Sequence, residues 1–281
     1  MVSVFDSGFV LGDGVWEGLR VVDGHPAFVE PHLDRLFETA RAIVLDIGLS
    51  REALTRALYE TIEANDLIND AHLRLMVTRG VRRQPYQDPR LALGKATVVV
   101  VPARSPHDPE AAARGLDLFT VHVRRAAPDV QDPKINSHSK FNCIAACIQA
   151  NAAGADEALM LDPHGFVATC NSTHFFIVRR GEVWTSSGKY CLGGITRGHV
   201  VTLCRRNDIA CRETDFSLTD VYGAEEAFVT GTLGGLTAVR CVDGRELSGP
   251  VPGPLTKRLQ ALYADLVRTD VAARQRPGPI A

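Results

Sequence analysis

Two lysines lie close together in the stretch "DPKINSHSK", where Lys134 and Lys140 enclose an asparagine and a histidine. An amine that is shielded from water loses its proton more readily, and it can then attack a carbonyl group or act as a general base. The residues after Lys140 predict a helix over 140–153, so this lysine lies where a helix begins. The alternative is that both lysines are solvated charges at a turn.

Two turns rich in glycine and threonine are suited to binding an anion. In "LGGITRG", at 192–198, two glycines and a threonine precede an amphipathic helix, so backbone N–H groups and the helix dipole converge there. In "VTGTLGG", at 229–235, Thr230 and Thr232 lie on a turn at the end of a predicted strand. Together with a lysine at the start of a helix, the two turns predict a phosphate-bearing cofactor that forms a Schiff base.

The elements that must position these residues alternate between strands and helices, which predicts the α/β fold class. In the first half we expect strands at 15–22, 71–79 and 97–101 and helices at 31–47 and from Ser50 to Ile62. In the second half we expect a strand at 117–124, the helix at 140–153 ended by Gly154, β-rich runs at 156–162, 165–180 and 182–187, a helix at 196–207, a strand at 225–232 and a last helix at 253–268.

A stretch with two prolines, mixed charges and a glycine, "ARSPHDPEAAARG", predicts a linker between two domains. We therefore expect a small α/β domain at 1–104, a linker at 105–115 and a larger cofactor-binding domain at 116–281.

The composition excludes several classes of protein. With 45% hydrophobic and 23% charged residues, the 281-residue chain is predicted to be soluble and globular. A net charge of −2 without a basic run argues against nucleic-acid binding, and the apolar runs are too short to span a membrane. No secretory signal is recognisable, which predicts a cytoplasmic protein with small-molecule partners. Seven scattered cysteines predict reduced core thiols and no metal site, although Cys143 and Cys147 lie one helical turn apart.

Eight short motifs occur in order between about residues 5 and 265: "FDSGFVLGDGVWEGLR", "HLDRL", "RLMVTRG", "RRAAP", "ADEALMLD", "GGITR", "AFVTGT" and "GPLTKRLQ". This series resembles the class IV, or fold type IV, aminotransferases, which bind pyridoxal 5'-phosphate. That family includes branched-chain aminotransferases, D-amino acid transaminases and aminodeoxychorismate lyase. The resemblance implies a two-domain enzyme with a small N-terminal α/β domain and a larger β-rich domain flanked by helices. It also implies a homodimer, in which the partner's small domain completes the active site.

The resemblance implies that the cofactor phosphate is bound by Arg35, by Ile195 and Thr196 of "GGITR", and by Thr232 of "TGT". Trp16 matches a position that shapes the substrate pocket. For Arg35 the alternative is an arginine on a solvent-facing helix surface, and for Trp16 it is a core tryptophan.

Gly18 also matches a pocket position. Arg20 and the arginines Arg79, Arg82 and Arg83 are candidates for binding the substrate carboxylate, because a guanidinium can donate two parallel hydrogen bonds to it. An exposed loop position is the alternative for each of them.

Two positions differ from the family pattern. An ungapped count places the Schiff-base lysine at Asn136 or at its neighbour Ile135, and an asparagine cannot form that bond. Lys140, at the predicted helix start, is therefore our candidate for the catalytic lysine, and Lys134 is the second candidate. The other position is Thr169, where the family has a glutamate that binds the pyridine nitrogen of the cofactor.

A hydroxyl at position 169 does not keep the ring nitrogen protonated, so it stabilises a carbanion less well than a carboxylate does. We predict a transaminase that moves an amino group between an amino acid, branched-chain or similar, and a 2-oxo acid, with Lys140 as nucleophile and as general acid and base. Thr169 is also consistent with a site rearranged around another group such as His174, for which an ordinary structural role is the alternative. One alternative function is a lyase or eliminase of the aminodeoxychorismate lyase type. The other is a catalytically silent homologue.

Overall fold

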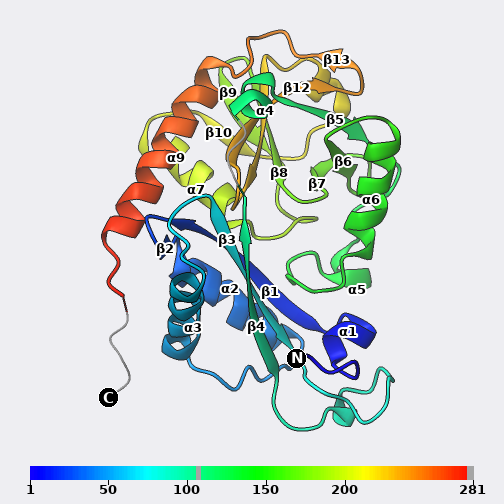
Figure 1. Ribbon diagram of the computed structural model, residues 1–281. Helices are drawn as coiled ribbons and strands as arrows, with labels where there is room; N and C mark the ends of the chain where they lie inside the picture. Colours follow the sequence, from blue (N-terminus) through cyan, green and yellow to red (C-terminus); the bar gives the residue numbers. More distant parts are fainter. Residues whose placement is uncertain (106–108, 277–281) are drawn as a thin grey trace. The chain divides into compact units, whose positions relative to one another are not determined.

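The structure is a computed structural model that describes residues 1–105 and 109–276, and they form two compact units. The first unit contains residues 1–105, 135–139 and 267–276, and the second contains 109–134 and 140–266. Figure 1 shows the elements of both units along the chain.

The first unit is built on a four-stranded antiparallel sheet. Its strand order is β2 (His25–Pro26), β1 (Gly14–Val22), β3 (Ala71–Thr78) and β4 (Thr97–Arg104). Residues of β1 alternate between a buried face and a less buried one, as expected for a strand whose side chains point to opposite sides.

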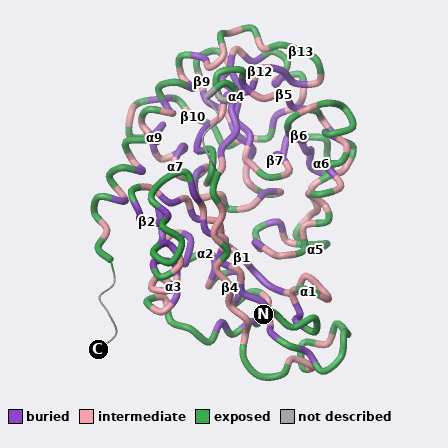
Figure 2. Tube along the Cα trace, in the orientation of Figure 1, coloured by how far each residue is buried: buried purple, intermediate pink, exposed green. Residues whose placement is uncertain are grey.

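Two helices cover the buried face of this sheet. They are α2 (Val29–Ala42) and α3 (Arg51–Ala64), and their leucines pack with the inward residues of β1 and β3 in one hydrophobic core. These residues are purple in Figure 2. The Ser50 hydroxyl accepts a hydrogen bond from the Ala53 amide at 3.2 Å, so it caps α3 as predicted.

Two later chain segments complete this unit. Residues 135–139 lie along β1, where Val15 pairs with Ser137 and the Trp16 amide donates to the Asn136 carbonyl at 3.0 Å. After residue 266 the chain returns, and the Asp270 carboxylate accepts a hydrogen bond from the Phe28 amide at 2.7 Å. Both segments fall inside the stretch 116–281 that the sequence assigned to the larger domain, so the compact units differ from that division.

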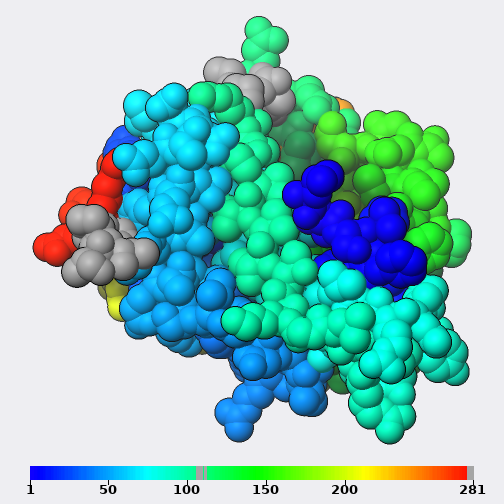
Figure 3. Space-filling view, turned by 60° about the horizontal axis from the view of Figure 1, so that its bottom comes forward, coloured from blue at the N-terminus to red at the C-terminus, as the bar shows by residue number. Residues whose placement is uncertain are grey.

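The N-terminal residues and the loop that follows β3 lie side by side on the surface of this unit (Figure 3). Asp6, just before α1 (Ser7–Leu11), forms a bridge with Val81, and the Arg82 amide donates to the Phe5 carbonyl at 2.9 Å. The same loop contains the short helix η1 (Pro89–Leu91).

The second unit is built on a nine-stranded mixed sheet. Its strand order is β10-β9-β8-β11-β12-β5-β6-β7, with β13 paired to β12 off this path. The strands are β5 (Leu116–Thr120), β6 (Glu157–Leu161), β7 (Val167–Cys170), β8 (His174–Arg179), β9 (Glu182–Thr185), β10 (Cys211–Glu213), β11 (Glu226–Gly231), β12 (Gly235–Val242) and β13 (Arg245–Glu246).

Helices flank this sheet. They are α4 (Pro109–Arg114), α5 (Pro128–Gln131), α6 (Phe141–Ala152), α7 (Ile195–Arg206), α8 (Leu218–Tyr222) and α9 (Pro254–Ala272). α6 packs its alanines against β5 and β6 in a small core, and a larger core fills the other side of the sheet.

Several predicted elements are confirmed with shifted ends. Strand β5 ends at Thr120, four residues earlier than predicted, and α9 continues to Ala272. The central strand β12 was missed altogether. All seven cysteines are free thiols, and Cys170, Cys191, Cys204 and Cys241 are buried. Within the described residues, no helix has the length and apolar character to cross a membrane.

Candidate active site

The first predicted anion-binding turn lies in the second unit, at the N-terminus of α7. Gly194 is the N-cap residue and has no side chain that could cap the helix, so Ile195 and Thr196 present their amides where an anion is favoured. The Thr196 side chain is 4% exposed, and its hydroxyl lies 3.3 Å from the Tyr263 hydroxyl. This tyrosine on α9 holds the threonine in place.

The second predicted turn lies next to the first. On β11, Thr230 pairs with His174 of β8, and the His174 ring also forms a hydrogen bond of 2.8 Å with the Leu192 carbonyl. A Cβ atom on Gly194 would overlap the His174 ring, so a larger residue there would displace the histidine. His174 therefore connects the end of β11 with the start of α7. We call the site formed by the two turns, residues 192–198 and 229–235, the cup.

One hydroxyl in this cup lacks a partner. Thr230 is fully buried, and its Oγ1 atom has no hydrogen-bond partner among the described residues. An unsatisfied buried hydroxyl costs about 1–3 kcal/mol, so it is rare unless a ligand uses it. Thr232 follows two residues later, in the turn between β11 and β12.

A buried carboxylate holds the turn that precedes β8. Glu157 on β6 accepts hydrogen bonds from the amides and hydroxyls of Ser172 and Thr173, at 2.8–3.0 Å. Burial raises the pKa of Glu157 despite these hydrogen bonds. The residue fixes the corner that leads into His174, and the sequence analysis did not identify it.

The chain has five lysines, and four of them are exposed: Lys95, Lys134, Lys189 and Lys257. Lys140 alone is partly buried, and it is the N-cap residue of α6. Lys134 donates from Nζ to the Gly188 carbonyl at 3.3 Å on the surface of the second unit. By burial, Lys140 is the stronger of the two predicted candidates.

Thr169 lies on β7, paired with Met160 of β6, and is 5% exposed. Its hydroxyl donates to the Thr173 carbonyl at 2.7 Å. The hydroxyl of Thr169, the residue predicted to stand where the family has a glutamate, is therefore hydrogen-bonded to the backbone of the second unit.

In the first unit, the Arg35 guanidinium is held by a buried carboxylate. Glu17 is fully buried and accepts hydrogen bonds from Arg35 Nε at 2.8 Å and Nη2 at 2.6 Å, and from His32 Nδ1 at 2.6 Å. Burial raises the pKa of Glu17, but the hydrogen bonds from Arg35 and His32 outweigh it, so the net shift is downward. The arginine side chain is 14% exposed, which contradicts the alternative of a solvent-facing helix arginine.

Asn136 belongs to the same cluster. It is 2% exposed, and its Nδ2 atom donates to the Trp16 carbonyl at 2.6 Å and lies 3.5 Å from Glu17 Oε1. The residue at the expected Schiff-base position therefore holds segment 135–139 against β1.

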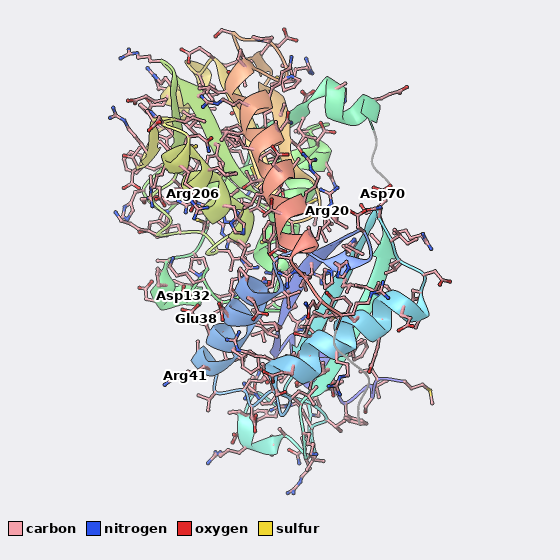
Figure 4. All side chains as sticks on the ribbon, turned by 90° about the vertical axis from the view of Figure 1, so that its left-hand side faces the viewer. Arg20, Glu38, Arg41, Asp70, Asp132 and Arg206 are labelled. Carbon is pink, nitrogen blue, oxygen red and sulfur yellow. The ribbon has the colours of Figure 1, made fainter. Side chains whose placement is uncertain are left out.

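Three predicted substrate residues share one face of β1. Trp16, Gly18 and Arg20 lie on the face of β1 opposite to the one that α2 and α3 cover. The Arg74 guanidinium stacks on the Trp16 ring, 3.8 Å from the ring centroid. Arg20 lies at the same end of this sheet as Asp70 (Figure 4). Arg74 was not predicted, although the alternation in "AHLRLMVT" places it on the less buried face of β3; in the structure it pairs with Gly18 of β1.

The arginines after β3 divide into two kinds. Arg79 forms an ion pair with Asp13 at 2.8 Å, and Arg82 is fully buried against the carbonyls of Tyr86 and Asp88, so both hold the loop together. Arg83 is exposed. Of the three, only Arg83 has a side chain on the surface.

Comparisons with known proteins identify the family of the chain. A model of the family described as amino-transferase class IV matches residues 14–242. The branched-chain-amino-acid aminotransferase of Pseudomonas aeruginosa is 34% identical over 275 residues, which cover 94% of this chain and 88% of the relative. Branched-chain-amino-acid aminotransferase-like protein 2 of Arabidopsis thaliana is 37% identical over 267 residues, but the chain spans only 47% of its length.

Among solved structures, the T.th. branched-chain amino acid aminotransferase with pyridoxamine 5'-phosphate has a TM-score of 0.90 at 27% identity. The match covers 98% of this chain and 90% of that structure. The predicted fold type IV architecture is confirmed, and the chain belongs to the class IV amino-transferase family.

Proposed function

We propose that this chain is a pyridoxal-phosphate-dependent transaminase that moves an amino group between a branched-chain or similar amino acid and a 2-oxo acid. Membership of the family and the names of the Pseudomonas and Arabidopsis relatives support this substrate class. The pyridoxamine 5'-phosphate of the T.th. structure supports the cofactor.

The observation that carries the proposal is the cup at the start of α7. An uncapped helix N-terminus, a glycine packed against the His174 ring and the unpartnered Thr230 hydroxyl all suit a phosphate group. Within the second unit, Ile195 and Thr196 would bind the phosphate through their amides, and Thr232 through its hydroxyl. From the first unit, Arg35 is the proposed side-chain ligand.

Pyridoxal phosphate supplies an aldehyde and an electron-withdrawing ring when it is bound. Lys140 is the proposed nucleophile, and as general base and acid it would take the proton from the substrate α-carbon and donate it to the carbon of the cofactor's former aldehyde group. Trp16 and Gly18 would shape the substrate pocket, and Arg20 and Arg83 would bind the carboxylate.

Thr169 supports a second candidate function. Its hydroxyl donates to the Thr173 carbonyl and cannot supply the negative charge that keeps a pyridine nitrogen protonated. This favours chemistry that depends less on a strong electron sink, such as elimination or cleavage by a lyase. Asn136 supports a third, a protein that binds the cofactor without turning over, because its amide is committed to the Trp16 carbonyl.

We further propose a cytoplasmic homodimer that acts on small molecules and binds neither nucleic acid nor membranes. The net charge of −2 and the absence of a basic run support the choice of small-molecule partners.

Equilibrium dialysis of pyridoxal phosphate, followed by incubation with single amino acids and a 2-oxo acid acceptor, tests the proposal. A transaminase should yield a new oxo acid and a new amino acid in equal amounts. Thr232→Val should weaken cofactor binding by roughly 10-fold through the loss of one charge-assisted hydrogen bond, whereas Thr202→Val, later in α7, should not. Ammonia or a cleaved fragment as product would favour the lyase, and binding without any product would favour the silent homologue.

A further inference from the structure

Helix α9 contacts both turns of the cup through one side chain. Tyr263 is 6% exposed, and its hydroxyl lies 3.3 Å from the Thr196 hydroxyl in the first turn. Its ring packs against Gly235 at the end of the second turn, where an added Cβ atom would come within 3.3–3.4 Å of two ring carbons. Gly235 also has a φ of 62°, in the left-handed region that favours glycine. Tyr263 therefore bridges the two turns that form the cup.

Further hydrogen bonds fix α9 beside the cup. Gln260, which lies nearly one helical turn before Tyr263, donates from Nε2 to the Leu236 carbonyl of β12 at 3.0 Å. At the start of α9, the buried carboxylate of Glu226 accepts hydrogen bonds from the amide and the hydroxyl of Thr256, at 2.8 and 2.7 Å. The Tyr263 hydroxyl is thus presented by a helix that is anchored to the sheet at two points, which keeps its position defined.

The Tyr263 and Thr196 hydroxyls can form a chain that ends on an anion. Each hydroxyl has one hydrogen to donate and can also accept. The oxygens of a phosphate dianion only accept, so Thr196 would donate to the phosphate while Tyr263 donates to Thr196. Hydrogen bonds linked in this way polarise and strengthen one another. The distance of 3.3 Å between the two oxygens exceeds the roughly 2.7–2.8 Å usual for hydroxyl pairs, so the contact can shorten when an anion binds.

We propose that Tyr263 is a positioning residue that makes the cup selective for ligands with a phosphate group. Its hydroxyl donates to Thr196 and so directs the Thr196 hydrogen towards the phosphate, while its ring keeps the turn at Gly235 in place. The inference rests on the phosphate-binding cup of the proposed function, and it adds a residue that acts through Thr196 rather than on the ligand itself.

Equilibrium dialysis with pyridoxamine 5'-phosphate and with pyridoxamine tests this selectivity, because the two ligands differ only in the phosphate and neither has an aldehyde that could react with a lysine. Tyr263→Phe removes the hydroxyl and keeps the ring. It should weaken binding of pyridoxamine 5'-phosphate about 5-fold and leave the affinity for pyridoxamine unchanged.

Tyr222→Phe is the matched control, because the Tyr222 hydroxyl on α8 donates to the Asp243 carboxylate at 2.8 Å, outside the cup. Neither affinity should change in this variant. Equal losses for both ligands in Tyr263→Phe would indicate a general structural effect, and they would overturn the proposal. An unchanged affinity of Tyr263→Phe for pyridoxamine 5'-phosphate would overturn it as well.

A double-mutant cycle tests whether Tyr263 acts through Thr196. Thr196→Val removes the hydroxyl in the middle of the chain, so adding Tyr263→Phe to it should weaken binding of pyridoxamine 5'-phosphate no further. Additive losses in the double variant would contradict the proposed chain. A phosphate-specific effect of Tyr263→Phe in a protein that forms no transaminase products would refute the proposed function and leave the role of Tyr263 intact. Transaminase products from a chain in which Tyr263→Phe has no such effect would do the reverse.

Discussion

Asn136 and Trp16 are joined by two hydrogen bonds: the asparagine side chain donates to the Trp16 carbonyl at 2.6 Å, and the Trp16 amide donates to the Asn136 carbonyl at 3.0 Å. Asn136 thus ties segment 135–139 to strand β1 of the first unit, next to the isolated bridge between Val15 and Ser137. It also lies beside the buried carboxylate of Glu17.

Asn136→Ala should lower the free energy of unfolding by about 1–3 kcal/mol, because it leaves a buried carbonyl and carboxylate with fewer donors. Urea unfolding measures this change. Asn65→Ala serves as the control, since Asn65 is exposed and its side chain donates to the Thr61 carbonyl in the last turn of α3. The Asn65→Ala substitution should lower the free energy of unfolding by no more than about 1 kcal/mol. Equal losses for both variants would show that the buried amide has no special role.

Arg35→Ala should destabilise the fold by about 3–5 kcal/mol, because it leaves Glu17 buried without its cation. Adding Glu17→Gln to this variant should recover part of that loss. Cofactor binding must therefore be measured in the double variant and compared with Glu17→Gln alone. If Arg35 binds phosphate, the double variant should bind pyridoxal phosphate at least about 10-fold more weakly. Equal affinities would remove Arg35 from the cofactor site.

The stability of the protein should fall as the pH is lowered below 6.5. Burial lowers the pKa of His32 from its usual 6.5, more than the Glu17 carboxylate raises it, so below pH 6.5 the unfolded chain gains a proton that the folded chain resists. The contribution is fully present above pH 6.5 and is lost as the pH falls. One such proton changes the free energy of unfolding by up to about 1.4 kcal/mol per pH unit.

Urea midpoints between pH 7.5 and 5 test this in three proteins. His32→Gln should flatten the pH dependence, and His164→Gln, at an exposed position, should leave it as in the unmodified chain. If the urea midpoints of all three proteins change equally with pH, a group other than His32 is responsible for the pH dependence.

Lys140→Ala should abolish the covalent attachment of pyridoxal phosphate, because Lys140 is the one lysine that is partly buried. Borohydride reduction followed by peptide mapping should find the label on Lys140 in the unmodified chain. Lys134→Ala should change neither the labelling nor the stability by more than about 0.5 kcal/mol, since Lys134 is exposed. A label on Lys134, or none on a chain that binds the cofactor, would overturn the assignment.

Thr169→Glu should raise the rate of oxo acid formation about 10-fold, if a carboxylate at this position binds the pyridine nitrogen and lowers the barrier by about 1.4 kcal/mol. The charge of the new side chain is the tested quantity, so Thr169→Gln, which is similar in size, is the control and should not be faster. A glutamate variant that binds the cofactor but is slower than the unmodified chain would point to lyase chemistry.

The sequence predicted well those features that depend on local patterns. The apolar spacing of α2 and α3, the cap at Ser50 and the glycine-rich start of α7 are readable within a few residues of each site. The cup also follows from local signals, since "GGITR" and "TGT" each mark a turn.

Features that depend on distant contacts could not be predicted. Glu17 and Asn136 are 119 residues apart in sequence, and nothing local indicates that the two side chains meet. The same holds for His174 and Gly194, whose contact depends on the path of β8 beside α7. Strand β12 was missed because its register with β11 and β5, rather than a strict alternation, determines which residues are buried.

The return of residues 135–139 to β1 has a consequence for synthesis on the ribosome. Residues 1–105 leave the ribosome first, but the strand edge at Val15 and Trp16 gains its partner only after Ser137 has emerged. The hydrogen bond from the Phe28 amide to the Asp270 carboxylate forms only after residue 270 has been synthesised. The unit that starts first is therefore the last to be completed, and a nascent chain stalled before residue 135 should expose the edge of β1 to aggregation or to chaperones.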